Sequence, residues 1–430
     1  MLVTGQFNDG FLPILDGVVN VVKNYAEWLH ERYGNTYVVT PSFPNYVDQE
    51  PYTVLRYPSI AIPFRAPYRQ GLPSLDGSLL MTLRKIPFDI VHTHTPFSAG
   101  NLALYTARKR GIPVVASFHS KYYDDLYAAL KVEAAARYGV RRIVDFYESV
   151  DHVWTVNHGT ADTLREYGFK GHIDVVPNGT DFTPPTDYAM RRAQADQELG
   201  LSGTYPVLLY VGQHVWQKNL KTLFDALLQV KRAGQPFRML MVGSGYAEEE
   251  LKILAESMDL CDEIRFLGSV RDRERLKRIY CRADLFFFPS IYDNASIALR
   301  EAAACKCPAL LVNGANTAEG IVDGENGFLA ENTPDALSAR ILEVVQTPGI
   351  LLRAGEKAQQ SVYTSWDRVM EEVDGRYAEI IKAGVNRKQS VLIPISPLHL
   401  HAQSVREERI ARRQYRLIRR RITRLVRRIL

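Results

Sequence analysis

Two carboxylates in the second half of the chain have the spacing and setting to hold a sugar attached to a phosphate. Seven residues separate Asp293 from Glu301, and both lie near a helix that we expect over residues 295–304, with Asn294 as its N-cap. The first backbone N–H groups of such a helix suit a phosphate. A carboxylate beside these N–H groups can accept hydrogen bonds from sugar hydroxyls. A second carboxylate, two turns further along, can accept hydrogen bonds from the hydroxyls of a ribose. The alternative is an ordinary strand and helix with two incidental acids.

Lys218 is the cation whose position best suits a diphosphate. It follows a glycine that ends an apolar strand, and it directly precedes a helix expected over residues 219–230. A lysine ammonium is a compact point charge, and the start of the helix adds its dipole. The sequence therefore predicts a diphosphate clamp at Lys218, with a solvated surface lysine as the alternative.

Elements that could position these residues alternate along the whole chain. Short apolar runs alternate with helical patterns, which is typical of parallel sheets with helices on both faces. In the first half we expect strands at 2–4, 37–39, 54–56, 90–91, 114–117, 153–156 and 173–175 and helices at 18–30, 98–110, 124–149 and 160–167. In the second half we expect strands at 207–211, 239–242, 264–267, 285–288, 309–312 and 328–329. Such sheets bind ligands at the carboxyl ends of their strands.

Three histidines follow expected strands of the first half. His92 and His94 lie at one strand end, and His119 lies at the next. A metal site is one interpretation, but neither cysteines nor an acidic cluster accompany these residues. The other is that an imidazole, above all that of His119, hydrogen-bonds a substrate hydroxyl.

The stretch LFFFPSIYDNASIALRE resembles the E-x7-E motif of the retaining GT-B-fold glycosyltransferases of family four, with Asp293 in place of the first Glu. The resemblance implies that Asp293 contacts the donor sugar and Glu301 its ribose. It also implies that the donor meets the chain at Ala295, Ser296 and Ile297. The family often has Phe-Gly at the first two of these positions.

Other stretches of the first half resemble the same family. PILDGV, around Gly17, is similar to its P-x-x-x-G-V stretch, which lies near the donor diphosphate. A single glycine before a helix is weak evidence, and a plain turn is the more common reason for it. The strand end that carries His119 resembles the one whose histidine points at the donor sugar.

Two further stretches of the second half resemble the family. In VGQHVWQK, Lys218 matches the lysine of the G-R-x-x-x-x-K stretch, but Gln213 replaces its arginine and removes one cation. In IRFLGSV, the resemblance implies that backbone groups at Ser269 and Val270 meet the base.

The resemblance, which covers about residues 1–385, implies a GT-B α/β fold of two doubly wound, Rossmann-like domains facing a cleft. We expect an acceptor domain at 1–183, a donor domain at 184–363 and a helix at 364–385 that crosses back to the first domain. A tether and a basic amphipathic helix would follow at 386–430.

The tail carries most of the positive charge. Residues 406–430 hold eleven Arg and two Glu, or +9, whereas the whole chain is +5, so the remainder is −4. Apolar residues recur on one face of the expected helix. We therefore expect the tail to lie on an anionic membrane; nucleic acid and a partner protein are the alternatives. The start of the chain is unlike a signal peptide, and we expect a cytoplasmic protein on the inner face of the membrane.

We therefore expect a retaining glycosyltransferase that moves a hexose from a UDP-sugar, such as UDP-glucose, to a lipid or glycan acceptor. His119, Asp293 and Lys218 would be the catalytic residues. Neither a metal nor another cofactor is expected, and nucleic acid is not expected as a partner. The alternatives are a catalytically weak nucleotide-sugar binder that anchors or regulates a membrane assembly, motivated by Gln213 and Asp293, and a nucleotide-sugar epimerase.

Overall fold

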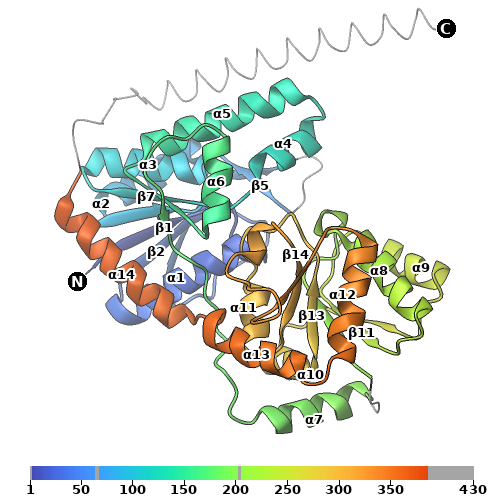
Figure 1. Cartoon of the computed structure of the whole chain (residues 1–430). Helices are drawn as coiled ribbons and strands as arrows, with labels where there is room; N and C mark the ends of the chain where they lie inside the picture. Colours follow the sequence, from blue (N-terminus) through green and yellow to red (C-terminus); the bar gives the residue numbers. More distant parts are fainter. Residues whose placement is uncertain (1, 63–66, 202–204, 386–430) are drawn as a thin grey trace, which may run out of the picture.

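The computed structural model describes residues 2–62, 67–201 and 205–385. Two parallel sheets, each covered by helices, form two lobes of the molecule (Figure 1). The expected tether and basic helix at 386–430 lie outside the described residues.

The first sheet has the strand order β3-β2-β1-β6-β7-β8-β9, and its neighbouring strands are parallel. Its strands are β1 (Thr4–Phe7), β2 (Thr36–Pro41), β3 (Thr53–Tyr57), β6 (Ile90–Thr93), β7 (Val114–Phe118), β8 (His152–Thr155) and β9 (Asp174–Val175). The helices of this lobe are α1 (Gly17–Tyr33), α2 (Gly77–Lys85), α3 (Ser98–Arg110), α4 (Tyr122–Leu130), α5 (Glu133–Ser149) and α6 (His158–Glu166). A small hairpin of β4 (Ser59–Ala61) and β5 (Arg69–Gly71) and a 3-10 turn at Pro73–Leu75 complete it.

The second sheet has the order β12-β11-β10-β13-β14-β15 and is also parallel. Its strands are β10 (Val207–Val211), β11 (Arg238–Val242), β12 (Ile264–Gly268), β13 (Leu285–Phe288), β14 (Ala309–Val312) and β15 (Phe328–Ala330). Its helices are α7 (Tyr188–Leu199), α8 (Leu220–Arg232), α9 (Glu248–Ser257), α10 (Arg273–Arg282), α11 (Ile297–Ala304), α12 (Pro334–Gln346) and α13 (Ile350–Ser361), with 3-10 turns η2 (Trp216–Lys218) and η3 (Asn316–Ala318). The strand order reverses between β10 and β13, which is where open parallel sheets bind ligands.

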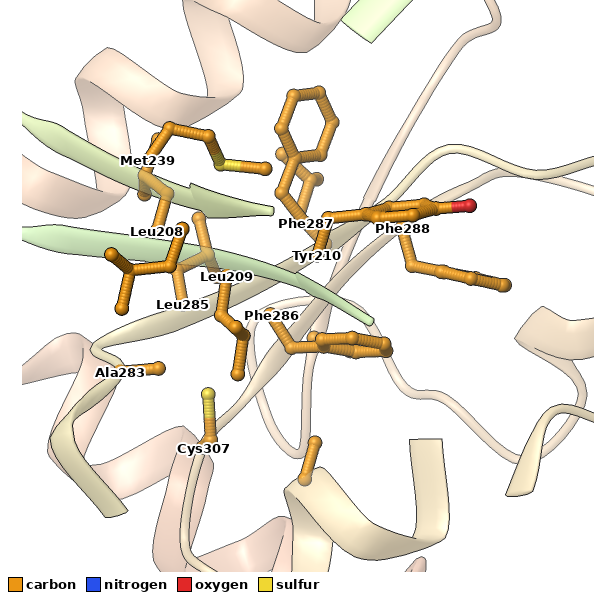
Figure 2. Packing of buried hydrophobic residues seen from close by; sticks show 14 of the residues in the cluster. Leu208, Leu209, Tyr210, Met239, Ala283, Leu285, Phe286, Phe287, Phe288 and Cys307 are labelled. Atoms are coloured by element: carbon orange, nitrogen blue, oxygen red, sulfur yellow. The ribbon is translucent and has the colours of Figure 1, made fainter. Parts of the chain in front are cut away.

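The two central strands of the second sheet are buried on both faces. Every residue of β13 is buried, because helices cover both sides of the sheet. Phe288 stacks on Tyr210 of β10 with 5.6 Å between ring centroids, and Phe286 stacks on Phe288 at 5.4 Å. Figure 2 shows these rings in the packed interior. The tight packing gives the loops after β10 and β13 a rigid base.

Helix α14 (Trp366–Ala383) returns from the second lobe to the first (Figure 1). Its apolar face, which includes Met370 and Tyr377, packs against α1 in one buried cluster. At the crossing point, a Cβ on Gly179 would lie 2.7 Å from the backbone nitrogen of Trp366, so only glycine fits there. This helix ties the two lobes together.

Several expected boundaries were wrong. The first strand begins at Thr4 and not at Leu2, and it carries Gln6 into the sheet. The long helix expected over 124–149 is two helices, because Lys131 takes a left-handed conformation, with φ of 52°, at the end of α4.

The helix expected to begin after Asn294 begins at Ile297, with Ser296 as the residue before it. Asn294 is therefore not its N-cap, because the loop after β13 runs two residues further than expected.

Candidate functional site

Lys218 and Asp293 form an ion pair at the carboxyl ends of β10 and β13. The Nζ of Lys218 donates to Oδ1 of Asp293 at 2.7 Å, and the two side chains are 12% and 20% exposed. The other carboxylate oxygen of Asp293 accepts a hydrogen bond from the Ser290 hydroxyl. Lys218 also lies over the ring of Phe288, 5.4 Å from its centroid. The two predicted residues thus meet at the reversal point of the sheet.

Two helices begin beside this pair with free backbone groups. Within the described part of the chain, neither α8 nor α11 has a capping side chain at its first turn. Their first N–H groups are therefore available to an acceptor, and the dipole of each helix favours a negative charge there. Together with Lys218, they form a setting suited to the phosphates of a nucleotide.

The loop between β13 and α11 crosses to the first lobe. Asn294 donates from Nδ2 to the backbone oxygen of His119 at 2.6 Å, and its own backbone oxygen accepts from Nδ2 of Asn157 at 2.8 Å. Lys121 donates to the backbone oxygen of Ile291 at 2.7 Å. Across the domain interface, His119 therefore contacts Asn294, the residue that follows Asp293.

The His119 ring is neutral at neutral pH. Burial lowers the pKa of His119 to about 4, because the charged imidazolium loses its hydration. Its Nε2 lies 3.2 Å from Nδ1 of His94. Both ring nitrogens of His94 and both of His92 have hydrogen-bond partners.

Glu301 lies about one turn into α11 and is already paired. Its side chain is 7% exposed and forms an ion pair with Arg273 at 2.6 Å, and it accepts from the Tyr280 hydroxyl at 2.9 Å. Arg273 also donates a hydrogen bond to the Asp181 carboxylate, and its Cζ lies 4.4 Å from the centroid of the Phe182 ring. A ribose at Glu301 would have to share the carboxylate with Arg273, so this role stays a prediction.

Gln213 and Ser269 lie at the same edge of the second sheet but do not contact the ion pair among the described residues. Gln213 is exposed, and its backbone oxygen accepts from the Tyr210 hydroxyl at 3.0 Å. Ser269 hydrogen-bonds the Ser244 hydroxyl at 2.8 Å. The loops around them pack backbone to backbone, since a Cβ on Gly243 would lie 1.9 Å from the Gly212 oxygen.

The remaining predicted donor residues are spread along the domain interface and the second sheet. Gly17 opens α1, and no atom lies within 4 Å of the place where its Cβ would be. Val270 packs on the core of the second lobe. The backbone oxygen of Ala295 accepts from Asn178 at 3.3 Å, and Ile297 packs on the cluster around α14.

A cavity of about 130 Å³ lies between the lobes at the start of α11. Ala295 and Ser296 line it together with Arg300 and Glu319, but Lys218, Asp293 and His119 do not. It has room for about four waters, whereas pockets for drug-sized ligands usually measure about 300–1,000 Å³. It is therefore not the predicted donor site.

Glu319 joins the lobes beside this cavity. Its two carboxylate oxygens accept from the backbone N–H groups of His158 and Gly159 at 3.0 and 2.9 Å. These groups begin α6, so a side chain of the second lobe caps a helix of the first. Polar contacts that water could replace thus add to the apolar contacts of α14 in joining the lobes.

Neither Arg273 nor the role of Asn294 at the domain interface could be predicted from a local pattern. Arg273 lies 28 residues before Glu301, and only the fold brings them together. Ser290 could have been identified, because a hydroxyl three residues before Asp293 has the usual spacing of a local side-chain hydrogen bond.

Across the described ranges, His, Cys, Asp and Glu side chains do not gather in threes that could hold a metal ion. Nor, in those ranges, does a helix have the length and apolar character needed to cross a membrane.

Two family models match the sequence. The model described as Glycosyltransferase Family 4 matches residues 15–183, and the one described as Glycosyl transferases group 1 matches residues 191–361. The chain is 26% identical over 369 residues to the alpha-monoglucosyldiacylglycerol synthase of Acholeplasma laidlawii, covering 83% of this chain and 92% of that protein. It is 24% identical over 354 residues to the Streptococcus pneumoniae protein of the same name, covering 80% and 78%.

Solved structures share the arrangement of the two lobes. Sucrose-phosphate synthase from Thermosynechococcus elongatus has a TM-score of 0.72 at 19% identity, covering 89% of this chain and 100% of that one. The Anabaena protein HepE, in complex with UDP and glucose, has a TM-score of 0.69 at 16% identity, covering 88% and 100%. At these identities the likeness shows the fold alone, and it confirms the predicted pair of Rossmann-like domains.

Proposed function

Because the chain belongs to family 4 of the GT-B glycosyltransferases, we propose that it transfers a hexose from a UDP-sugar, UDP-glucose first among them, to a lipid acceptor at a membrane surface. The chain is an enzyme that transfers sugar. The donor, the acceptor and the retained configuration of the product are parts of the proposal.

One observation carries the proposal: Lys218 and Asp293 meet between two helix starts that lack capping side chains. A leaving nucleoside diphosphate develops negative charge as the bond to the sugar breaks. The Lys218 ammonium and the first N–H groups of α11 are fixed positive groups that would stabilise that charge. Asp293 would turn from Lys218 to a sugar hydroxyl once the diphosphate binds. Protein groups thus do the work of a metal, and we propose that none is needed.

The acceptor is proposed from the relatives and from the tail. The two relatives above are named as synthases of a glucosylated diacylglycerol. Residues 406–430 carry eleven Arg and two Glu, a composition that favours an anionic lipid surface. Together they support a peripheral enzyme that receives its acceptor from the membrane.

Donor binding would require the lobes to move. The loop after β13 is bonded to the first lobe through Asn294 and Lys121, and Lys218 is held by Asp293. A nucleotide sugar would break some of these contacts and re-form them around itself. Such closure excludes water and protects the donor from hydrolysis.

The test is a transfer assay with the full chain. UDP-glucose, UDP-galactose and GDP-mannose are each incubated with diacylglycerol in vesicles that contain anionic lipid. Release of UDP or GDP and the glycolipid product are measured, and NMR of the product gives its anomeric configuration. We expect UDP release that depends on the lipid and is lost in Lys218→Ala. Silence with every donor, together with unchanged donor binding in Lys218→Ala, would overturn the proposal.

Two further outcomes separate the alternatives. A nucleotide-sugar binder without turnover would bind UDP-glucose but release no UDP. An epimerase would interconvert UDP-glucose and UDP-galactose without any acceptor.

A further inference from the structure

A buried hydrogen-bonded cluster lies behind His119 in the first lobe. It joins Gln6 of β1, His92 and His94 at the end of β6, and Tyr377 of α14. Gln6, His92 and His94 are fully buried, and so is Tyr377. His94 stacks between His92 and His119, with ring centroids 4.2 and 5.5 Å away.

The contacts of Tyr377 set the direction of the others. The Tyr377 oxygen lies 2.6 Å from Nδ1 of His92 and 3.4 Å from Nε2 of Gln6, and the Gln6 amide nitrogen can only donate. The Tyr377 oxygen must therefore accept from Gln6, and Tyr377 donates its single proton to His92.

The orientation of the Gln6 amide determines the proton positions on the next two rings. With Nε2 turned to Tyr377, Oε1 of Gln6 faces Nε2 of His94 at 3.0 Å and must accept its proton. Burial lowers the pKa of His94 well below its ordinary value, so its ring carries one proton only. Nδ1 of His94 is left as an acceptor, and at 3.2 Å it receives the Nε2 proton of His119.

His119 then presents a lone pair on its other nitrogen. Its ring is neutral at pH 7, because burial lowers the pKa of His119 to about 4. With the proton on Nε2, Nδ1 is free to accept, and none of the described residues hydrogen-bonds to it.

We propose that Gln6 and His94 are positioning residues, which hold His119 in the Nε2–H tautomer so that its Nδ1 accepts a hydrogen bond from a hydroxyl of the donor sugar. The part about the sugar rests on the proposed function. A neutral acceptor at this place adds no positive charge beside a sugar that becomes cationic as its bond to the diphosphate breaks.

Two substitutions at position 6 separate the hydrogen bond from the packing. Gln6→Met keeps the length of the side chain but cannot accept from His94. Gln6→Glu retains a carboxyl oxygen that can accept from Nε2 of His94. Thr40→Val is the matched control, since Thr40 is buried in the neighbouring strand β2 and its hydroxyl has no hydrogen-bond partner among the described residues.

The direct test is the ¹⁵N NMR spectrum of the full chain labelled at its histidine rings. The signal that is lost in His119→Gln identifies the ring. We expect an unprotonated Nδ1 on His119 in the parent, in Gln6→Glu and in Thr40→Val. In Gln6→Met we expect a mixture of tautomers, and kcat/KM for the donor to fall about tenfold, with the melting temperature measured for every variant to show that each one is folded.

Two results would overturn the inference: a proton on Nδ1 of His119 in the parent, or the same His119 spectrum in Gln6→Met and in the parent. If the parent lacks transfer activity, the proposed function fails, and the NMR spectrum still decides whether Gln6 sets the tautomer. The two failures are therefore distinguishable.

Discussion

Replacing Asp293 by Asn should strengthen the binding of UDP and weaken catalysis at the same time. Asp293 holds the Lys218 ammonium at 2.7 Å, and its carboxylate lies where a diphosphate would need that cation. The carboxylate therefore competes with the diphosphate and repels it. Asn has the same shape without the charge.

The size of the effect follows from the geometry. Two unit charges about 6 Å apart repel by roughly 3 kcal/mol at an effective dielectric constant of about 20. The pair is partly exposed, and solvent and salt reduce this to about 1–2 kcal/mol. UDP should therefore bind Asp293→Asn about 5 to 30 times more tightly. Turnover of UDP-glucose should fall by about 100-fold or more, because the sugar loses its charged partner.

The assay is calorimetric titration of UDP at two salt concentrations, beside the transfer assay. Lys218→Met is the matched control and should weaken UDP binding. In the double variant, Asp293→Asn should strengthen UDP binding less than it does in the parent. The reason is that Lys218, the cation for which the Asp293 carboxylate and the diphosphate compete, is gone. Weaker or unchanged UDP binding in Asp293→Asn would refute the competition between the carboxylate and the diphosphate.

Three further predictions follow from the same contacts. Gln213→Arg supplies a second cation at the end of β10 and should tighten UDP binding by about tenfold; titration showing no change would place the diphosphate elsewhere. Glu301→Ala leaves the buried Tyr280 hydroxyl without its acceptor, whereas the partly exposed Arg273 keeps Asp181, and should lower the free energy of unfolding by about 1–2 kcal/mol in urea, which a loss below about 0.5 kcal/mol would contradict. The pKa of His119 is lowered to about 4 in the folded chain from an ordinary 6.5, so the unfolded chain binds more protons between these values. The contribution of His119 to stability should therefore be complete above pH 6.5 and fall by roughly 2 kcal/mol down to pH 5, in addition to the contributions of His92 and His94, whose pKa values burial also lowers; His119→Gln should make the slope less steep by this amount, and an equally steep slope in that variant would assign all of it to other groups.

The sequence was sufficient to predict the framework of the second lobe. Residues 207–211, 285–288 and 309–312 form strands with the expected boundaries, because their apolar runs have polar, proline or glycine residues on each side. Lys218 and Asp293 were expected at one site, and the structure joins them directly. The glycines and prolines beside the strands determined where these loops begin.

What the sequence could not predict depends on contacts between distant residues. Gln6 lies 88 positions from His94, and the strand that carries it was expected two residues too early. The partner of Glu301 comes from another helix, and Asn294 serves the domain interface and not the helix start. Local patterns identify which residues are suited to the chemistry, but tertiary packing decides which partners they have.

The most direct measurement is the crystal structure of the full chain with UDP-glucose. We predict that the diphosphate lies within hydrogen-bond distance of Nζ of Lys218 and of the first N–H groups of α11, with the sugar between Asp293 and His119. A nucleotide bound in the cavity beside Glu319, or a domain interface that stays closed by its own side chains at saturating UDP-glucose, would contradict the account.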